Sequence, residues 1–175
     1  MTPSAPTAPG RGTPGWAVLL ALTSAFTLSH AYRTVAAIMA PQLEAEFRLT
    51  PQALGVFAGA FHFAFGALQL LMGVGIDLYG VRRTALVAFP LAILGAALSA
   101  WTTNFEVLVF AQVLIGAGCA PAFLVCTVYI ARHYPPAQYA SVSGAVLGIG
   151  GIGMLATGTP LAWLIEAQSW RAGFV

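Results

Sequence analysis

An arginine in the middle of an apolar run is the first residue of this sequence with clear chemical potential. Arg33 lies eight residues before Pro41, and His30 precedes it by one helical turn. A charge inside a bilayer costs a few kcal/mol, so it is expected to face a cavity or a partner. Arg33 would bind a carboxylate or phosphate, with His30 beside it. The alternative is that Arg33 extends to the outer headgroups, since it lies about two turns from the expected helix end.

Small and polar residues also repeat every three or four positions along residues 55–77. A helix places them all on one face, where glycines allow a neighbouring helix to approach and polar groups face the bundle interior. His62 and Gln69 would line a pathway, and His62 could titrate with a coupled proton. Hydrogen bonding between helices is the alternative for both. The stripe consists of Gly55, Gly59, His62, Gly66, Gln69, Gly73 and Asp77.

The stripe continues into a short charged loop. Asp77 closes the helical stretch, where the helix dipole disfavours an anion, so it requires a positive partner such as Arg82, Arg83 or the start of another helix. A contact of this kind on one side of the membrane could gate a pathway. The alternative is that the loop only sets membrane topology. The candidate gating residues are Gly73, Asp77, Gly80, Arg82 and Arg83.

The composition is that of a membrane protein. Of 175 residues, 59% are hydrophobic and 7% are charged, whereas about a quarter are charged in soluble domains. Mean hydropathy is +0.85. The small net charge of +2 and the lack of a basic stripe exclude typical nucleic-acid binding. The sequence contains no paired carboxylates, Ser/His/Asp set, phosphate loop or metal-ligand cluster, so we expect no enzyme activity, cofactor or metal site. Cys119 and Cys126 are too far apart on one helix for a disulfide.

Five apolar runs are long enough to cross a bilayer as helices. Residues 1–14 are expected to be a disordered tail, residues 41–50 a loop, and the small residues before Pro121 a bend. A cleaved signal peptide is the alternative for the first run, because residues 29–31 loosely resemble a cleavage site. The expected helices cover residues 15–40, 51–77, 84–101, 107–131 and 140–165.

Four segments, in chain order, resemble the major facilitator superfamily. Residues 73–84 resemble its loop signature, although Gly75, Leu78 and Val81 depart from the pattern. Residues 112–120 resemble its helix-four pattern, with Gln112 in place of an arginine, which weakens any proton-coupling role for this helix. Residues 131–136 are similar to the link after helix four, and residues 170–174 to the lead into helix six.

The resemblance implies an all-α membrane protein, with residues 15–175 forming a partial N-terminal half-bundle that stops before the sixth helix. It implies secondary transport by alternating access, as a symporter or antiporter coupled to a proton or another ion. The Arg33-to-Pro41 spacing is similar to that of organic-anion carriers in this superfamily, so a small organic anion is the expected substrate. The candidate substrate-binding residues are Arg33, His30, His62, Gln69 and Gln112.

Membrane orientation follows from the arginines near the expected helix ends. Four lie on the side of the N-terminus and two on the other, which favours a cytoplasmic N-terminus in a bacterial inner (plasma) membrane. The expected partners are the lipid bilayer, a small-molecule substrate, and a missing C-terminal half in cis or in trans. The alternative function is a truncated, non-transporting remnant or an interaction module that needs a partner polypeptide. The four arginines are Arg11, Arg82, Arg83 and Arg132, and the two are Arg48 and Arg171.

Overall fold

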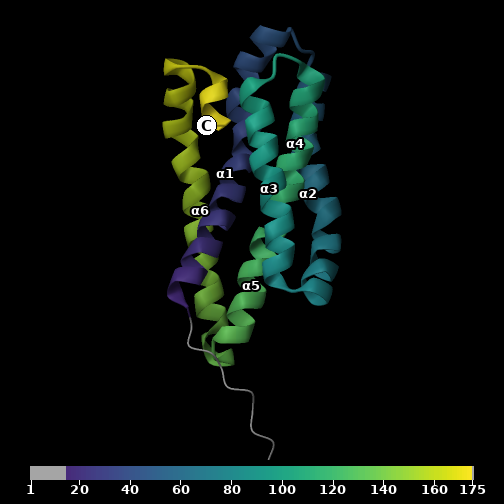
Figure 1. Ribbon diagram of the computed structural model, residues 1–175. Helices are drawn as coiled ribbons and strands as arrows, with labels where there is room; N and C mark the ends of the chain where they lie inside the picture. The colour runs from purple at the N-terminus through teal and green to yellow at the C-terminus, as the bar shows by residue number, and fades with distance from the viewer. Residues whose placement is uncertain (1–14, 175) are drawn as a thin grey trace, which may run out of the picture.

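Long helices account for nearly all of the described chain. The computed structural model describes residues 15–174, and the tail predicted for residues 1–14 lies outside that range. The helices run up and down between two ends of one bundle (Figure 1). They are α1 (Trp16–Phe47), α2 (Pro51–Tyr79), α3 (Val81–Trp101), α4 (Phe105–Cys119), α5 (Ala122–His133) and α6 (Pro136–Ala167), followed by a 3-10 helix, η1 (Trp170–Phe174).

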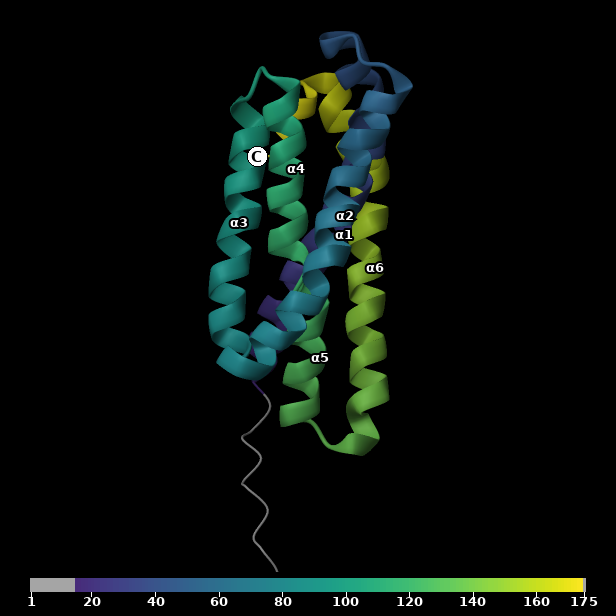
Figure 2. The same ribbon diagram turned by 90° about the vertical axis from the view of Figure 1, so that its right-hand side faces the viewer.

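Four spans are long and apolar enough to cross a membrane: α2, α3, α6 and the continuous span Phe105–His133 made by α4 and α5. Helix α1 is not among these four, although its 32 residues are long enough to cross a bilayer and it runs through the same bundle (Figure 2). The chain is therefore an all-α membrane protein, as the sequence predicted. Large apolar side chains on the outer faces of α2, α3 and α6 are exposed, as lipid contact requires.

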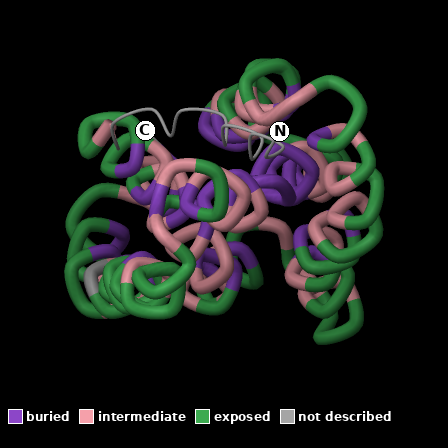
Figure 3. Tube along the Cα trace, turned by 90° about the horizontal axis from the view of Figure 1, so that it is seen from below, coloured by how far each residue is buried: buried purple, intermediate pink, exposed green. Residues whose placement is uncertain are grey.

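The span made by α4 and α5 lies at the centre of the bundle. Its most apolar window is 67% buried, against 17% for α2 and 18% for α6. The helix is interrupted at Ala120 and Pro121, where the sequence predicted a bend. Proline lacks the N–H that a continuous helix needs at this point, which accounts for the interruption. Buried positions gather toward the middle of the bundle and exposed ones lie on its outside (Figure 3).

The prediction of a loop over residues 41–50 is wrong for most of its length. Helix α1 continues through Pro41 to Phe47, and only the residues around Arg48 form the turn. Met39 and Leu43, which flank Pro41 at helical spacing, are both fully buried in one apolar cluster. A helix that continues through the proline keeps both on the buried face. Prolines are tolerated within membrane helices, where neighbouring helices support the backbone. The turn itself places Arg48 in the left-handed region, with φ 52°.

Close helix contacts depend on glycines of α4 and α6. A Cβ at Gly116 would overlap the Phe61 backbone of α2, and one at Gly118 would overlap Ala92 of α3. A Cβ at Gly153 of α6 would lie 2.6 Å from the carbonyl oxygen of Thr27 in α1. These glycines allow backbones to approach more closely than any larger residue would permit.

The glycine stripe of α2 is not packed against another helix of the described chain. Nothing lies within 4 Å of a Cβ built at Gly55, Gly59, Gly66 or Gly73. Helix α2 instead buries Phe57, Phe61, Ala64 and Ile76 against the bundle. No described helix packs against the stripe, because the aromatic face of α2 provides the apolar contact with α4. The approach of a neighbouring helix to the stripe stays a prediction.

Candidate functional site

The side chain of Arg33 is half-buried between α1 and α2. Its guanidinium carbon lies 4.3 Å from the centroid of the Phe65 ring of α2, a cation–π contact. Its Nε is buried and has no hydrogen-bond partner among the described residues. A buried donor on a charged group without a partner is costly, and an anion is the acceptor that would lower this cost most.

His30 lies one turn before Arg33 on the same helix. Its ring meets Phe26 edge-on, with centroids 4.5 Å apart and planes at 83°. Its Nδ1 is also buried without a hydrogen-bond partner in the described part of the chain. Two adjacent turns of α1 thus carry polar nitrogens that no described group satisfies.

The longer α1 changes the position of Arg33 along its helix. Arg33 lies 17 residues after Trp16 and 14 residues before Phe47, near the helix centre. At 1.5 Å per residue, the nearer end is roughly 21 Å away. Helix α1 is longer than the roughly 20 residues that cross a bilayer, so its ends extend beyond the hydrocarbon core. Arg33 therefore lies further from the end of its helix than the two turns that the sequence predicted.

Gln112 is fully buried in α4, and its Nε2 has no partner among the described groups. It stands one helical turn before Gly116, the glycine that contacts α2. Gln112 therefore faces the side of α4 that looks toward α2. No hydrogen bond joins Gln112 to Arg33 among the described residues. The two polar side chains therefore occupy separate positions inside the bundle.

The two polar residues of the α2 stripe differ in their surroundings. His62 is exposed, and its Nδ1 lies 3.0 Å from the carbonyl oxygen of Ala58 on its own helix. Gln69 is partly buried and lies four residues after Phe65, so it shares the side of α2 that meets Arg33.

The expected ion pair in the α2–α3 loop is absent from the described structure. Asp77, Arg82 and Arg83 are all exposed, and the ion pair found among residues 15–174 joins Arg171 to Glu46 instead. Helix α3 begins at Val81, directly after Gly80, so both arginines lie in its first turn. Gly80 has φ 82°, a conformation that suits glycine, and this tight junction leaves Asp77 at the end of α2.

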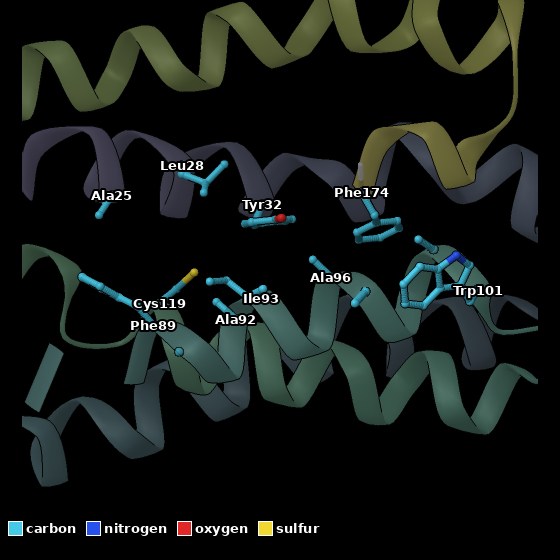
Figure 4. A pocket seen from close by; sticks show the side chains of 13 residues that line it. Ala25, Leu28, Tyr32, Phe89, Ala92, Ile93, Ala96, Trp101, Cys119 and Phe174 are labelled. Carbon is cyan, nitrogen blue, oxygen red and sulfur yellow. The ribbon is translucent and has the colours of Figure 1, made fainter. Parts of the chain in front are cut away.

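A cavity of about 500 Å³ lies on another side of α1, between α1, α3, α4 and η1. Tyr32, Cys119 and Phe174 point toward it from three of these elements (Figure 4). Its other lining residues are apolar or glycine, and none is charged. The cavity therefore suits apolar material, and Arg33 is not part of it.

Three features of the fold escaped the sequence analysis. Phe65 looked like one more apolar residue of α2, and only the fold places it under Arg33. Thr34 and Thr157 lie far apart in sequence, yet their hydroxyl oxygens are 3.0 Å apart between α1 and α6. Glu46 was part of the predicted loop over residues 41–50, and its pairing with Arg171, 125 residues later, cannot be read before the fold is known.

Comparison with known proteins gives a consistent result. A sequence model of the Major Facilitator Superfamily matches residues 21–175. The chain is 27% identical over 158 residues to a hexuronate transporter of Bacillus subtilis (strain 168), covering 90% of the chain and 37% of that protein. It is 23% identical over 150 residues to a probable sulfoacetate transporter, SauU, of Cupriavidus necator, covering 86% and 35%. It is 24% identical over 161 residues to the uncharacterized transporter YybO of Bacillus subtilis, covering 91% and 37%. The chain thus spans little more than a third of these relatives.

Proposed function

The chain belongs to the Major Facilitator Superfamily, and from that premise we propose that it works in a secondary carrier that moves a small organic anion by alternating access. The observation that carries this proposal is Arg33, a half-buried cation at the centre of α1 whose Nε has no partner among the described residues. Intramembrane charges of this kind typically mark substrate or ion pathways. Arg33 would hold the anionic group of the substrate, and His30 would contribute a second donor.

The chemistry of arginine supports a carboxylate or sulfonate substrate. A guanidinium offers donors in a planar fork that matches the oxygens of such groups. Two of the relatives are named for hexuronate and sulfoacetate, both of which are organic anions. Gln69 and Gln112 would provide hydrogen bonds to the uncharged part of the substrate. His62 is the candidate for a coupled proton, in symport or antiport.

A second half, in cis or in trans, would complete the pathway. The chain spans 37% of the hexuronate transporter, and two helices present glycines to open space. Open stripes of this type allow close approach of further helices. The transporter relatives favour a carrier completed by a second half over a remnant or a separate interaction module. Co-purification of the tagged chain with a second polypeptide would test whether that half is supplied in trans. The open positions are Gly55, Gly59, Gly66 and Gly73 of α2, and Gly144, Gly148, Gly151 and Gly158 of α6.

The distribution of arginines supports a cytoplasmic N-terminus in a bacterial plasma membrane. The start of α1 shares its end of the bundle with the α2–α3 junction and the α5–α6 link, which carry Arg82, Arg83 and Arg132. An impermeant maleimide should label Thr103→Cys, at the opposite end, in intact cells. Ala137→Cys should react only after the cells are permeabilised; the reverse pattern would contradict this orientation.

Uptake of radiolabelled glucuronate by cells producing the complete carrier, with this chain and its second half, tests the transport proposal. Replacement of Arg33 by alanine should abolish uptake while the amount of protein in the membrane is unchanged. Arg48→Ala is the matched control, because Arg48 is an exposed arginine at the end of the same helix. Equal uptake by the native chain and Arg33→Ala would overturn the proposed role of Arg33.

A further inference from the structure

Glu46 fastens the last turn of α1 to η1 at the distal end of the bundle, where the α3–α4 turn also lies. Arg171 of η1 binds both carboxylate oxygens of Glu46, with Nη2 2.7 Å from Oε1 and Nη1 3.2 Å from Oε2. The indole Nε1 of Trp170 donates a third bond to Oε2, at 2.6 Å. A bidentate pair with an added indole donor defines the carboxylate position far more closely than a single ion pair would.

The same cluster reaches a third element. Arg171 Nη2 also donates to the carbonyl oxygen of Thr102, at the end of α3, at 3.1 Å. The guanidinium carbon of Arg171 lies 4.3 Å from the Trp170 ring centroid, and Trp170 itself is buried. The distal clamp, defined as Glu46, Trp170, Arg171 and the Thr102 carbonyl, therefore joins α1, α3 and η1.

The clamp lies at one end of a row of contacts between α1 and α6. Thr34 meets Thr157 near the middle of the row, and Gln42 Nε2 donates to the Ile165 carbonyl oxygen at 3.0 Å closer to the clamp. Residue numbers rise together along the two helices, so α1 and α6 run parallel. The two hydrogen bonds and the clamp all hold α1 at the same position along the axis of α6. Of these three contacts, the clamp alone contains an ion pair.

Isolated surface ion pairs often stabilise a protein very little. This one differs in that its carboxylate has three donor contacts and its arginine stacks on a buried indole.

We infer that the distal clamp locks α1 to η1 and α6, so that α1 cannot slide or tilt independently of α6. The consequence for transport rests on the proposed function: Arg33, carried by α1, would keep a constant depth while larger parts of the carrier move. The clamp itself requires no substrate, so it can be tested independently of the proposed anion site.

Spin labels at Ala45→Cys and Ala140→Cys test the clamp directly, in the full chain with Cys119 and Cys126 replaced by alanine. Both label positions are exposed, one near the distal end of α1 and the other near the start of α6. Their separation lies mostly along the helix axes, roughly 40 Å at 1.5 Å per residue, so it reports axial sliding.

The native chain and the control Glu44→Gln should give the same narrow distance distribution by pulsed EPR. Glu44 is the matched control because it is an exposed glutamate two residues earlier on α1. Glu46→Gln should widen the distribution by about 1–2 Å, the scale of helix sliding. Equal distributions for Glu46→Gln and Glu44→Gln would overturn the inference.

Arg171→Lys is the second variant, and it allows the clamp to be tested even if Glu46→Gln does not fold. Lysine retains the charge but cannot form the bidentate pair, so the width should fall between those of the native chain and Glu46→Gln. A native distribution for Arg171→Lys would also contradict the clamp. Because no anion is added, a failure of Arg33 to bind substrate would leave every one of these outcomes unchanged.

Discussion

At the scale of single residues, Arg33 and Phe65 form the contact that carries most weight. The guanidinium carbon of Arg33 lies 4.3 Å from the centroid of the Phe65 ring, and the ring attracts the cation without using a hydrogen-bond donor. A ring in this position orients Arg33 without competing for its hydrogen bonds, as a carboxylate would. Phe65 is therefore a positioning residue for the proposed site.

Replacement of Phe65 by leucine should weaken glucuronate binding by about 2- to 10-fold, because a cation–π contact contributes about 0.5–1 kcal/mol or more. Phe63→Leu is the control, since Phe63 is 79% exposed on the same helix. Isothermal titration of the chain in lipid nanodiscs would measure both. Equal affinities for the two variants would show that Phe65 does not position Arg33.

Sequence alone predicts Arg33 and His30 as polar residues of one helix face, because a charge within an apolar run needs no fold to be noticed. It does not predict Phe65, since an aromatic residue on an apolar helix has no chemical signature of its own. It also misreads Asp77 and Glu46. Charge counting pairs Asp77 with nearby arginines, whereas the fold pairs Glu46 with Arg171, 125 residues later.

At the scale of elements, α1 departs most from the sequence prediction. Proline normally marks a helix boundary, and residues 41–50 contain three charges, so a loop was the natural expectation. Burial of Met39 and Leu43 on both sides of Pro41 outweighs that local signal. Tertiary contacts of this type cannot be read from a local window, although they decide how deep Arg33 lies.

The glycines divide into packed and open positions, and this division makes a prediction for stability. Gly116→Ala should destabilise the chain by about 1–3 kcal/mol, because its Cβ would overlap the Phe61 backbone. Gly59→Ala, with nothing within 4 Å of its Cβ, should leave stability unchanged or slightly raised. Thermal unfolding in detergent micelles would compare the two. A larger loss for Gly59→Ala would contradict the packing described here.

At the scale of the whole molecule, the helical periodicity and apolar length of the sequence were sufficient to predict an all-α membrane bundle. They could not show which helix faces would be left uncovered. The fold leaves the glycine stripes of α2 and α6 open, whereas glycines of α4 and α6 are occupied by close helix contacts. The open stripes are the surfaces at which a second half would pack in the proposed carrier.

The central claim is that Arg33 binds the anionic group of the substrate, and equilibrium binding tests it most directly. Labelled glucuronate would be titrated into the native chain and its variants in lipid nanodiscs, with uncharged glucose as the matched probe. The native chain and Arg48→Ala should bind glucuronate but not glucose, Arg33→Lys should bind glucuronate more weakly, and Arg33→Ala should not bind it. Equal glucuronate binding by the native chain and Arg33→Ala, or none by either, would contradict the claim.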